Sequence, residues 1–330
     1  MVSQKNLLRI LINTFLGGVL IYIWSRFVNL GEISTALSGV KLEYLLILVV
    51  LFLISGVLRS LRLKILLHEP KLSFINLIYL NLLAQFLSFM IPIRAGEITK
   101  GVYLSRFMHR PFPTTIIWVF IDRFIDFYVV ILLIVISLLF IPTNLPPSLI
   151  TGCEVLLIGM SILAVVIIKN QKFSEKLTNF LIPLFIVNSL KIYFISFIKS
   201  ILEGFSILDL SLIRWIKIMG VTLLAFIIDG MFWWVIFLAL GLDLGILPGI
   251  LGNALMALTF LIPAAPGYVG SAEASGLAVW TGILGLPTGI SSSGTVLFHL
   301  VSVVILMVAG LVSLYLLKFD LNLVWRRFRK

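Results

Sequence analysis

The feature that most constrains the fold of this chain is a series of long apolar runs. They fall at about 7–24, 42–58, 72–92, 114–141, 149–168, 212–240, 246–262, 267–286 and 292–317. A helix needs about 20 apolar residues to cross the hydrocarbon of a bilayer, and several runs reach that length. With 61% hydrophobic and 12% charged residues, the composition excludes a soluble globular fold. The sequence therefore predicts an all-α polytopic membrane protein.

The net charge of +11 would suggest a nucleic-acid partner in a soluble domain. Here Lys and Arg gather in short segments between the apolar runs, a pattern that sets topology and contacts anionic lipid headgroups. We therefore expect no nucleic-acid partner. The single cysteine, Cys153, excludes an internal disulfide and a Cys-rich metal site. The first run has no small-residue cleavage site after it, so we expect it to be retained as a helix.

The basic segments also predict orientation. Segments 59–71 and 93–113 are both rich in Lys and Arg and are predicted to be cytoplasmic, as are the region 169–211 and the C-terminal end. The uncharged loop "PTNLPP" (142–147) is predicted to be external. If 72–92 crossed the membrane, the first two basic segments would lie on opposite sides. The conflict disappears if 72–110 enters from the cytoplasm, breaks and returns.

Two similar stretches mark the predicted breaks, "LSFMIPIRAG" (87–96) and "LTFLIPAAPG" (258–267). Proline lacks an N–H and clashes with the preceding turn, and glycine tolerates the left-handed turn that follows. Because 241–245 and 287–291 lack positive charge, the hairpin 246–286 is predicted to enter from outside. The predicted break residues are Pro92, Gly96, Pro263, Pro266, Gly267 and Gly270.

The predicted architecture is one domain (1–330) of six spanning helices and two oppositely inserted re-entrant helical hairpins, with both termini cytoplasmic. The two repeats, about 7–141 and 149–317, would form the inverted repeat of many secondary transporters, in which broken helices build the substrate site. Eight ordinary helices with proline kinks are the alternative. Within about 169–211, an amphipathic helix is predicted to lie in the cytoplasmic interface or to join the repeats as an elbow.

Ionisable side chains at membrane depth are costly and are therefore candidates for function. Arg94, Glu97 and Lys100 are spaced three apart around the first break. Glu97 and Lys100 would share a helix face and could pair. The N-terminus of the returning half-helix, near Gly96 and beside Arg94, would bind an anion such as a lipid phosphate. Alternatively, Glu97 caps this half-helix and neutralises Arg94.

Three further charges lie in "FIDRFIDFY", namely Asp122, Arg123 and Asp126. Asp122 and Asp126 would bind a cation, relay protons or pair with Arg94 and Lys100. A purely structural ion-pair network explains them equally well. In "IIDGMFWW", Asp229 is predicted to be a lone carboxylate that carries a proton, contacts a lipid amine or bonds a nearby backbone break.

The stretch "PGYVGSAEASG" follows the second break. Its small residues are typical of close helix contacts, which leaves its only charge, Glu273, unexplained. His299 is predicted to be an interhelical hydrogen-bonding group rather than a ligand. The chain has no Walker A loop, GxSxG elbow, HExxH or Cys-based metal pattern, so we expect no catalytic residue, cofactor or metal.

The combination of "PIRAGEITK" with "PGYVGSAE" resembles the flippase-like family, the transmembrane region of bacterial lysylphosphatidylglycerol synthases (the multiple peptide resistance factor). The resemblance spans nearly the whole chain. Its first motif matches Pro92, Arg94, Gly96 and Glu97, and its second matches Pro266, Gly267, Gly270 and Glu273. Tyr268 stands where many members carry another glycine.

The resemblance implies translocation of a phospholipid or other lipid-linked headgroup between leaflets. Synthase members add a soluble aminoacyl-transferase domain, which we expect this chain to lack, so we expect it not to make an aminoacyl lipid. The resulting hypothesis is a lipid flippase of the cell membrane. The hairpin tips would meet near the midplane, where half-helix N-termini, Arg94 and Arg123 hold a phosphate and nearby carboxylates balance the cations.

The expected partners are anionic or phosphate-bearing membrane lipids, and possible partner enzymes are those that modify lipids or glycans. Two other functions stay open at this point. An intramembrane lipid transferase or phosphatase would use Glu97, Asp122 and Asp126 with a divalent cation. A non-catalytic membrane scaffold would need only the fold.

Overall fold

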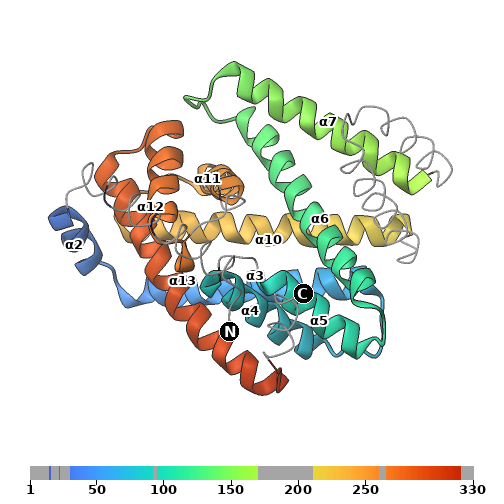
Figure 1. Cartoon of the computed structure of the whole chain (residues 1–330). Coiled ribbons are helices and arrows are strands. Elements are labelled where there is room, and N and C mark those ends of the chain that lie inside the picture. The colour runs from blue at the N-terminus through green and yellow to red at the C-terminus, as the bar shows by residue number, and fades with distance from the viewer. Residues whose placement is uncertain are drawn as a thin grey trace.

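The computed structural model describes residues 30–91, 95–169, 211–259 and 265–320, together with Phe15 and Tyr22. Every element within these ranges is helical (Figure 1). In chain order they are α2 (Leu30–Ser38), α3 (Leu42–Leu67), α4 (Phe74–Met90), α5 (Ala95–Phe107), α6 (Phe112–Leu138), α7 (Pro147–Lys169), α10 (Leu212–Ala239), α11 (Ile246–Thr259), the 3-10 turn η2 (Pro266–Tyr268), α12 (Ser271–Gly276), the π-helical segment η3 (Leu277–Ile283) and α13 (Thr288–Leu317).

The helices have the lengths and the apolar composition of a membrane protein. In the described ranges, α3, α10 and α13 are long and apolar enough to cross a bilayer. With 27 residues α6 is about 40 Å long at the usual helical rise, which also suffices in length, although it carries three charges. By contrast, α4, α5 and α11 have 17, 13 and 14 residues and are too short to span alone. Most of the predicted run 7–24, and 170–210 of the predicted amphipathic segment, lie outside the described residues.

One predicted boundary is wrong. The apolar run was expected to end at residue 58 and to give way to a basic cytoplasmic segment, but α3 continues to Leu67. Arg59 and Arg62 therefore lie on the helix, and the side chain of Arg62 is only 1% exposed. Arginines can extend a buried helix where carboxylates on neighbouring helices neutralise them, and no hydropathy pattern reports such partners. The short helix α2 was not predicted either.

Helices α3 and α10 form an antiparallel pair at the centre of the molecule (Figure 1). Near the end of α3, Leu63 and Leu66 share a hydrophobic cluster with Ile218, close to the start of α10. Near the start of α3, Leu48 belongs to a second cluster with Phe237, close to the end of α10. The two helices therefore run in opposite directions.

Two pairs of short helices begin at opposite ends of the α3–α10 pair (Figure 1). Helix α4 follows the end of α3 after the short link 68–73 and packs against α5, whereas α11 follows the end of α10 after 240–245 and packs against η3. Their inner ends meet, because the ring centroid of Phe89 on α4 lies 6.1 Å from that of Tyr268 in η2. At an outer end, the Asn144 N–H donates to the Ile283 carbonyl at 3.0 Å, so the "PTNLPP" loop touches the end of η3.

The outer surface of α13 is apolar. Val304, Val308 and Leu311 lie along one side of the helix and are 62%, 61% and 51% exposed. Such a continuous exposed apolar stripe is typical of a surface that faces lipid. Several charged side chains are buried instead, among them Arg62, Lys100 and Asp122.

Candidate functional site

The first break separates α4 from α5. The Gly96 N–H donates to Ser88 Oγ at 3.2 Å, and the Ser88 hydroxyl donates to a Glu97 oxygen at 3.3 Å, so α4 holds the start of α5. Gly96 does not adopt the left-handed turn that was predicted for it; it lies within α5 and has no positive φ. Glycine is needed there because a Cβ would overlap the Ala84 carbonyl oxygen. Pro92 and Arg94 lie outside the described residues.

At the second break the predicted backbone role of glycine is confirmed. Pro266 begins η2, and Gly267 and Gly270 have φ of 70° and 80°, in the region that favours glycine. Tyr268 also has a positive φ, 58°, at the position where the resembling family often carries glycine. Pro263 lies outside the described residues.

Glu273 and His299 hold the backbone of the second break by hydrogen bonds. One Glu273 oxygen accepts the Gly270 N–H at 2.8 Å, and the other lies 2.7 Å from His299 Nδ1. His299 Nε2 lies 2.6 Å from the Gly267 carbonyl oxygen and must donate, because a carbonyl can only accept. Glu273, which helix packing left unexplained, thus has a structural partner. The prediction that His299 makes interhelical hydrogen bonds is confirmed.

Three helices contribute to a buried charge network. Arg62 of α3 lies 2.8 Å from Asp122 and also bonds Asp126, both on α6. Lys100 of α5 lies 3.7 Å from Asp122, so the predicted pairing of Lys100 with this helix is confirmed. On the same helix, Arg123 lies 3.1 Å from Asp126.

Glu97 joins this network through Arg123, at 3.6 Å. The predicted pair between Glu97 and Lys100 does not form within 4 Å among the ion pairs of the described chain. Instead the two residues bind opposite charges on α6. The contacts support the structural ion-pair network, one of the alternatives that the sequence left open. Several members of this network also line a cavity, which is described below.

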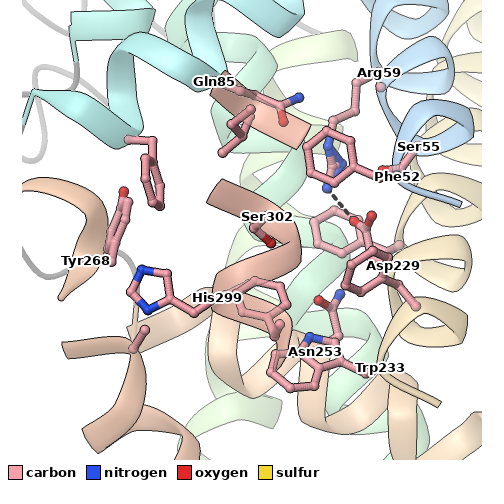
Figure 2. A pocket seen from close by; sticks show the side chains of 18 residues that line it. Phe52, Ser55, Arg59, Gln85, Asp229, Trp233, Asn253, Tyr268, His299 and Ser302 are labelled. Carbon is pink, nitrogen blue, oxygen red and sulfur yellow. Dashed lines mark hydrogen bonds and ion pairs between the residues drawn. The ribbon is translucent and has the colours of Figure 1, made fainter. Parts of the chain in front are cut away.

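Asp229 is not the lone carboxylate that was predicted. Arg59 of α3 donates to it at 2.5 Å (Figure 2). The Arg59 guanidinium also lies 5.1 Å from the centroid of the Phe226 ring. The Arg59 Nη1 atom is fully buried and has no hydrogen-bond partner among the described residues.

Arg59 and Arg62 are the site residues that sequence reasoning missed, because both were interpreted as topology signals. One signal could have found them. The predicted membrane carboxylates Glu97, Asp122, Asp126, Asp229 and Glu273 outnumber the predicted cations Arg94, Lys100 and Arg123. Buried carboxylates pair with cations, so two more cations at membrane depth were to be expected.

Two adjoining cavities lie between the helix tips. One, of about 300 Å³, is rich in aromatic rings, and the other, of about 280 Å³, is more charged. The residues that line both are Arg59, Gln85, Phe226, Ala257 and Tyr268. The charged cavity adds Ser88, Gly96, Glu97, Lys100, Arg123 and Asp126, so four of the eight predicted substrate-binding residues line it.

The aromatic cavity adds Asn253, His299 and Ser302, together with the Asp229 carboxylate and the Trp233 ring (Figure 2). Phe89 also lines it. Glu273 does not line either cavity, but its partner His299 does. Asp122 lies behind the charged wall with 1% exposure.

These features define a polytopic helical membrane protein with an interior polar cavity where two broken helix pairs meet. The chain belongs to the family described as the lysylphosphatidylglycerol synthase TM region, whose model matches residues 6–310. No curated protein and no solved structure gives a significant match. The resemblance found on the two sequence motifs is thereby confirmed.

Proposed function

We propose that the protein is a lipid flippase or transporter, which moves a phospholipid or another lipid-linked phosphate headgroup between the leaflets of the cell membrane. The observation that carries this proposal is the pair of adjoining cavities at the meeting point of the two breaks, with Arg59, Lys100 and Arg123 on their walls. Charged groups are costly at membrane depth and face substrate paths when they line a cavity. A phosphate is the charged part that lipid headgroups share.

The size of the cavities suits a headgroup rather than a whole lipid. Each is near the lower end of the range of about 300–1,000 Å³ for ligand sites. The headgroup would pass through the cavities while its acyl chains stay in the bilayer. The apolar stripe on α13, which includes Val304, offers those chains a lipid-facing surface.

We further propose that α4–α5 enters from the cytoplasm and that α11–η3 enters from outside, within inverted repeats of about 7–141 and 149–317 and with both termini cytoplasmic. Support comes from the attachment of the two helix pairs at opposite ends of α3–α10. The contact between Asn144 and Ile283 also supports a common side for the two uncharged ends.

Cysteine accessibility tests this topology. In a Cys153→Ser background, Lys71→Cys and His109→Cys are expected to react with an impermeant thiol reagent from the same side of the membrane, and Asn144→Cys from the opposite side. Labelling of Lys71→Cys and His109→Cys from opposite sides would contradict the hairpin arrangement and leave kinked spanning helices as the explanation.

The charges lining and supporting the cavities are balanced. Among the described residues, the cations Arg59, Arg62, Lys100 and Arg123 face the carboxylates Glu97, Asp122, Asp126 and Asp229. We propose that a phosphate competes with a carboxylate for one of these cations, so that the released carboxylate takes up a proton or a cation. Transport would then be coupled to an ion.

The described contacts favour translocation over the alternative of a metal-dependent transferase or phosphatase. Asp122 and Asp126, which such an enzyme would use, bind Arg62 and Arg123. We propose no catalytic role and no cofactor for this chain. We propose membrane lipids as its direct partners, and a lipid- or glycan-modifying enzyme as a second partner.

Reconstitution in liposomes tests the function. The wild-type protein is expected to make fluorescent phosphate-bearing lipids accessible to an external quencher faster than protein-free liposomes do. The charge-neutral double variant Arg123→Gln/Asp126→Asn should slow this by about tenfold or more, since charged hydrogen bonds to the headgroup are lost.

The matched control is Lys41→Gln/Glu43→Gln, which neutralises an ion pair whose side chains are 74% and 66% exposed and line neither cavity. It should translocate at the wild-type rate. If the folded wild-type protein gave no faster lipid translocation than protein-free liposomes, the proposal would be contradicted. A double variant as fast as wild type would remove the charged cavity from the mechanism.

A further inference from the structure

We infer that His299 and Glu273 form a proton-binding site, which holds one exchangeable proton while the hydrogen bonds of the second break are intact and frees the η2 turn when that proton leaves. The ligand of this site is the proton itself. The inference goes beyond the proposed function, because it concerns the backbone of the break and does not require that a lipid is moved. It rests on the hydrogen-bond partners of the two nitrogens of the His299 ring.

Both ring nitrogens of His299 face oxygen acceptors. Nε2 lies 2.6 Å from the Gly267 carbonyl oxygen, so Nε2 carries a hydrogen. Nδ1 lies 2.7 Å from a Glu273 oxygen. A neutral imidazole carries a hydrogen on only one nitrogen, so the lone pair of Nδ1 would face the lone pairs of an ionised carboxylate. The two short contacts therefore require one proton more than a neutral imidazole and an ionised carboxylate contain together.

The additional proton lies in the bond between Nδ1 and the Glu273 oxygen, on either of the two atoms. With this proton, the pair is an imidazolium beside a carboxylate or an imidazole beside a carboxylic acid, and in both forms its net charge is zero. Release of the proton to solvent leaves a net negative charge on the pair. The two side chains are only 13% and 7% exposed, and an unpaired charge in such surroundings is costly. The proton is therefore part of the intact contact.

Loss of the proton breaks one of the two bonds, because the single hydrogen that remains on the ring serves either Gly267 or Glu273. Both partners belong to the second break. Gly267 lies in η2 with a φ of 70°, and the other Glu273 oxygen accepts the Gly270 N–H at 2.8 Å. His299 itself lies within the long helix α13. The backbone of the break, rather than α13, is therefore the part that loses a contact and becomes free to move.

The surroundings of His299 give the proton a route and leave Glu273 as the charge that acts on it. The ring lines the aromatic cavity, so the proton exchanges with the contents of that cavity (Figure 2). Helix α4 presents the Phe89 ring edge-on at 6.0 Å, and η3 has no titratable residue. The titratable groups that the other packed elements present here are Glu273 of α12, Tyr268 of η2, Arg59 of α3 and Asp229 of α10. Arg59 and Asp229 pair with each other.

Nitrogen-15 NMR of the full-length protein in detergent measures the protonation of the ring. In His68→Asn/His109→Asn, His299 is the only histidine, and asparagine tolerates the positive φ of these two positions, 49° and 52°. At about pH 7 a free imidazole is mostly neutral. We expect two protonated ring nitrogens at this pH or, if the proton lies on the carboxyl group, an infrared band of a carboxylic acid that Glu273→Gln removes. A neutral ring beside an ionised carboxylate would overturn the inference.

Hydrogen exchange of the amides of 266–274 measures the release of the break. Glu273→Gln is the informative variant, since its amide oxygen still accepts the Gly270 N–H and its amide N–H donates to a neutral His299 without the additional proton. From about pH 7 to about pH 9, the wild type should come to exchange about tenfold faster relative to Glu273→Gln at the same pH, as loss of one charged hydrogen bond would give. Glu43→Gln, at a side chain that is 66% exposed, is the control and should exchange like wild type.

A ratio of the two exchange rates that stays constant with pH would overturn the release of the η2 turn. A ring in Glu273→Gln that is as protonated as in wild type would overturn Glu273 as the partner. The occupancy of the ring in His68→Asn/His109→Asn requires no change at the site, so it tests the proton even if Glu273→Gln does not fold. The proposed function fails separately, because a protein that gives both expected results but moves no lipid in liposomes contradicts translocation alone.

Discussion

Arg62 is the central contact of the buried charge network, so its removal gives the sharpest stability prediction. Its side chain is 1% exposed and bonds both Asp122 and Asp126. Replacing one partner of a buried ion pair leaves an uncompensated charge and costs about 3–5 kcal/mol. In Arg62→Met, Asp122 keeps Lys100 at 3.7 Å and Asp126 keeps Arg123 at 3.1 Å. We therefore expect a loss of about 3 kcal/mol, at the lower end of that range.

Reversible unfolding of the purified protein in mixed micelles, by titration with a denaturing detergent, measures this loss. Lys41→Met is the control, because its ion pair with Glu43 is long, 3.9 Å, and exposed. Such a pair contributes about 0–1 kcal/mol, so the control should unfold close to wild type. An Arg62→Met protein whose unfolding free energy lies within about 1 kcal/mol of wild type would refute the network as a stabilising feature.

Three further predictions follow from single positions. Gly96→Ala should lower the unfolding free energy by about 1–3 kcal/mol, because its Cβ would overlap the Ala84 carbonyl of α4. Gly220→Ala is the control, since no atom lies within 4 Å of a Cβ at that position, and equal effects of the two changes would contradict the close contact between α4 and α5. His299→Leu should cost about 1–3 kcal/mol, and less when Glu273→Gln accompanies it; full additivity of the two changes would show that they are not coupled. The hydrogen bond from the Trp234 indole, and then that from a backbone N–H, hold the pKa of Asp243 below its usual range. The stabilisation that the Asp243 carboxylate gives the folded protein should therefore be complete above about pH 3.9 and be lost as the pH falls through the lower folded pKa. Tryptophan fluorescence should change over this pH range in the wild type but not in Asp243→Asn, and a midpoint at or above about pH 3.9 would contradict the prediction.

The helices themselves were largely predictable, because a membrane helix is encoded by a local property. The run 212–240 matches α10 (Leu212–Ala239) to within a residue at its C-terminal end. The same criterion ended α3 too early, at Arg59, since a charge counts against an apolar run even where the fold neutralises that charge. The partner that neutralises Arg59 lies 170 residues away, at Asp229.

The sequence predicted where the helices break, but only partly why glycine is needed at each break. Gly267 and Gly270 have the positive φ that proline and glycine beside each other predict. Gly96 is needed instead for its contact with the Ala84 carbonyl, a packing relation between two helices that no local pattern contains. The pairing of Glu273 with His299 likewise depends on how the second break packs on α13.

The site was predicted as a set of residue types rather than as a set of pairs. Glu97, Lys100, Arg123 and Asp126 do line one cavity, as charges at membrane depth suggested. Which cation faces which carboxylate depends on the relative rotation of α3, α5 and α6. That rotation is set by the packing of apolar side chains, which a single sequence does not specify residue by residue.

The central claim is that a lipid headgroup passes through the two cavities, and blocking their junction tests it most directly. In a Cys153→Ser background, Ala257→Cys places a thiol on the lining of both cavities, and Val304→Cys places one on the lipid-facing side of α13, at a position that is 62% exposed. After complete reaction with a bulky thiol reagent, lipid translocation in liposomes should fall to the protein-free rate for Ala257→Cys and stay at its unreacted rate for Val304→Cys. Undiminished translocation by fully labelled Ala257→Cys would contradict the claim.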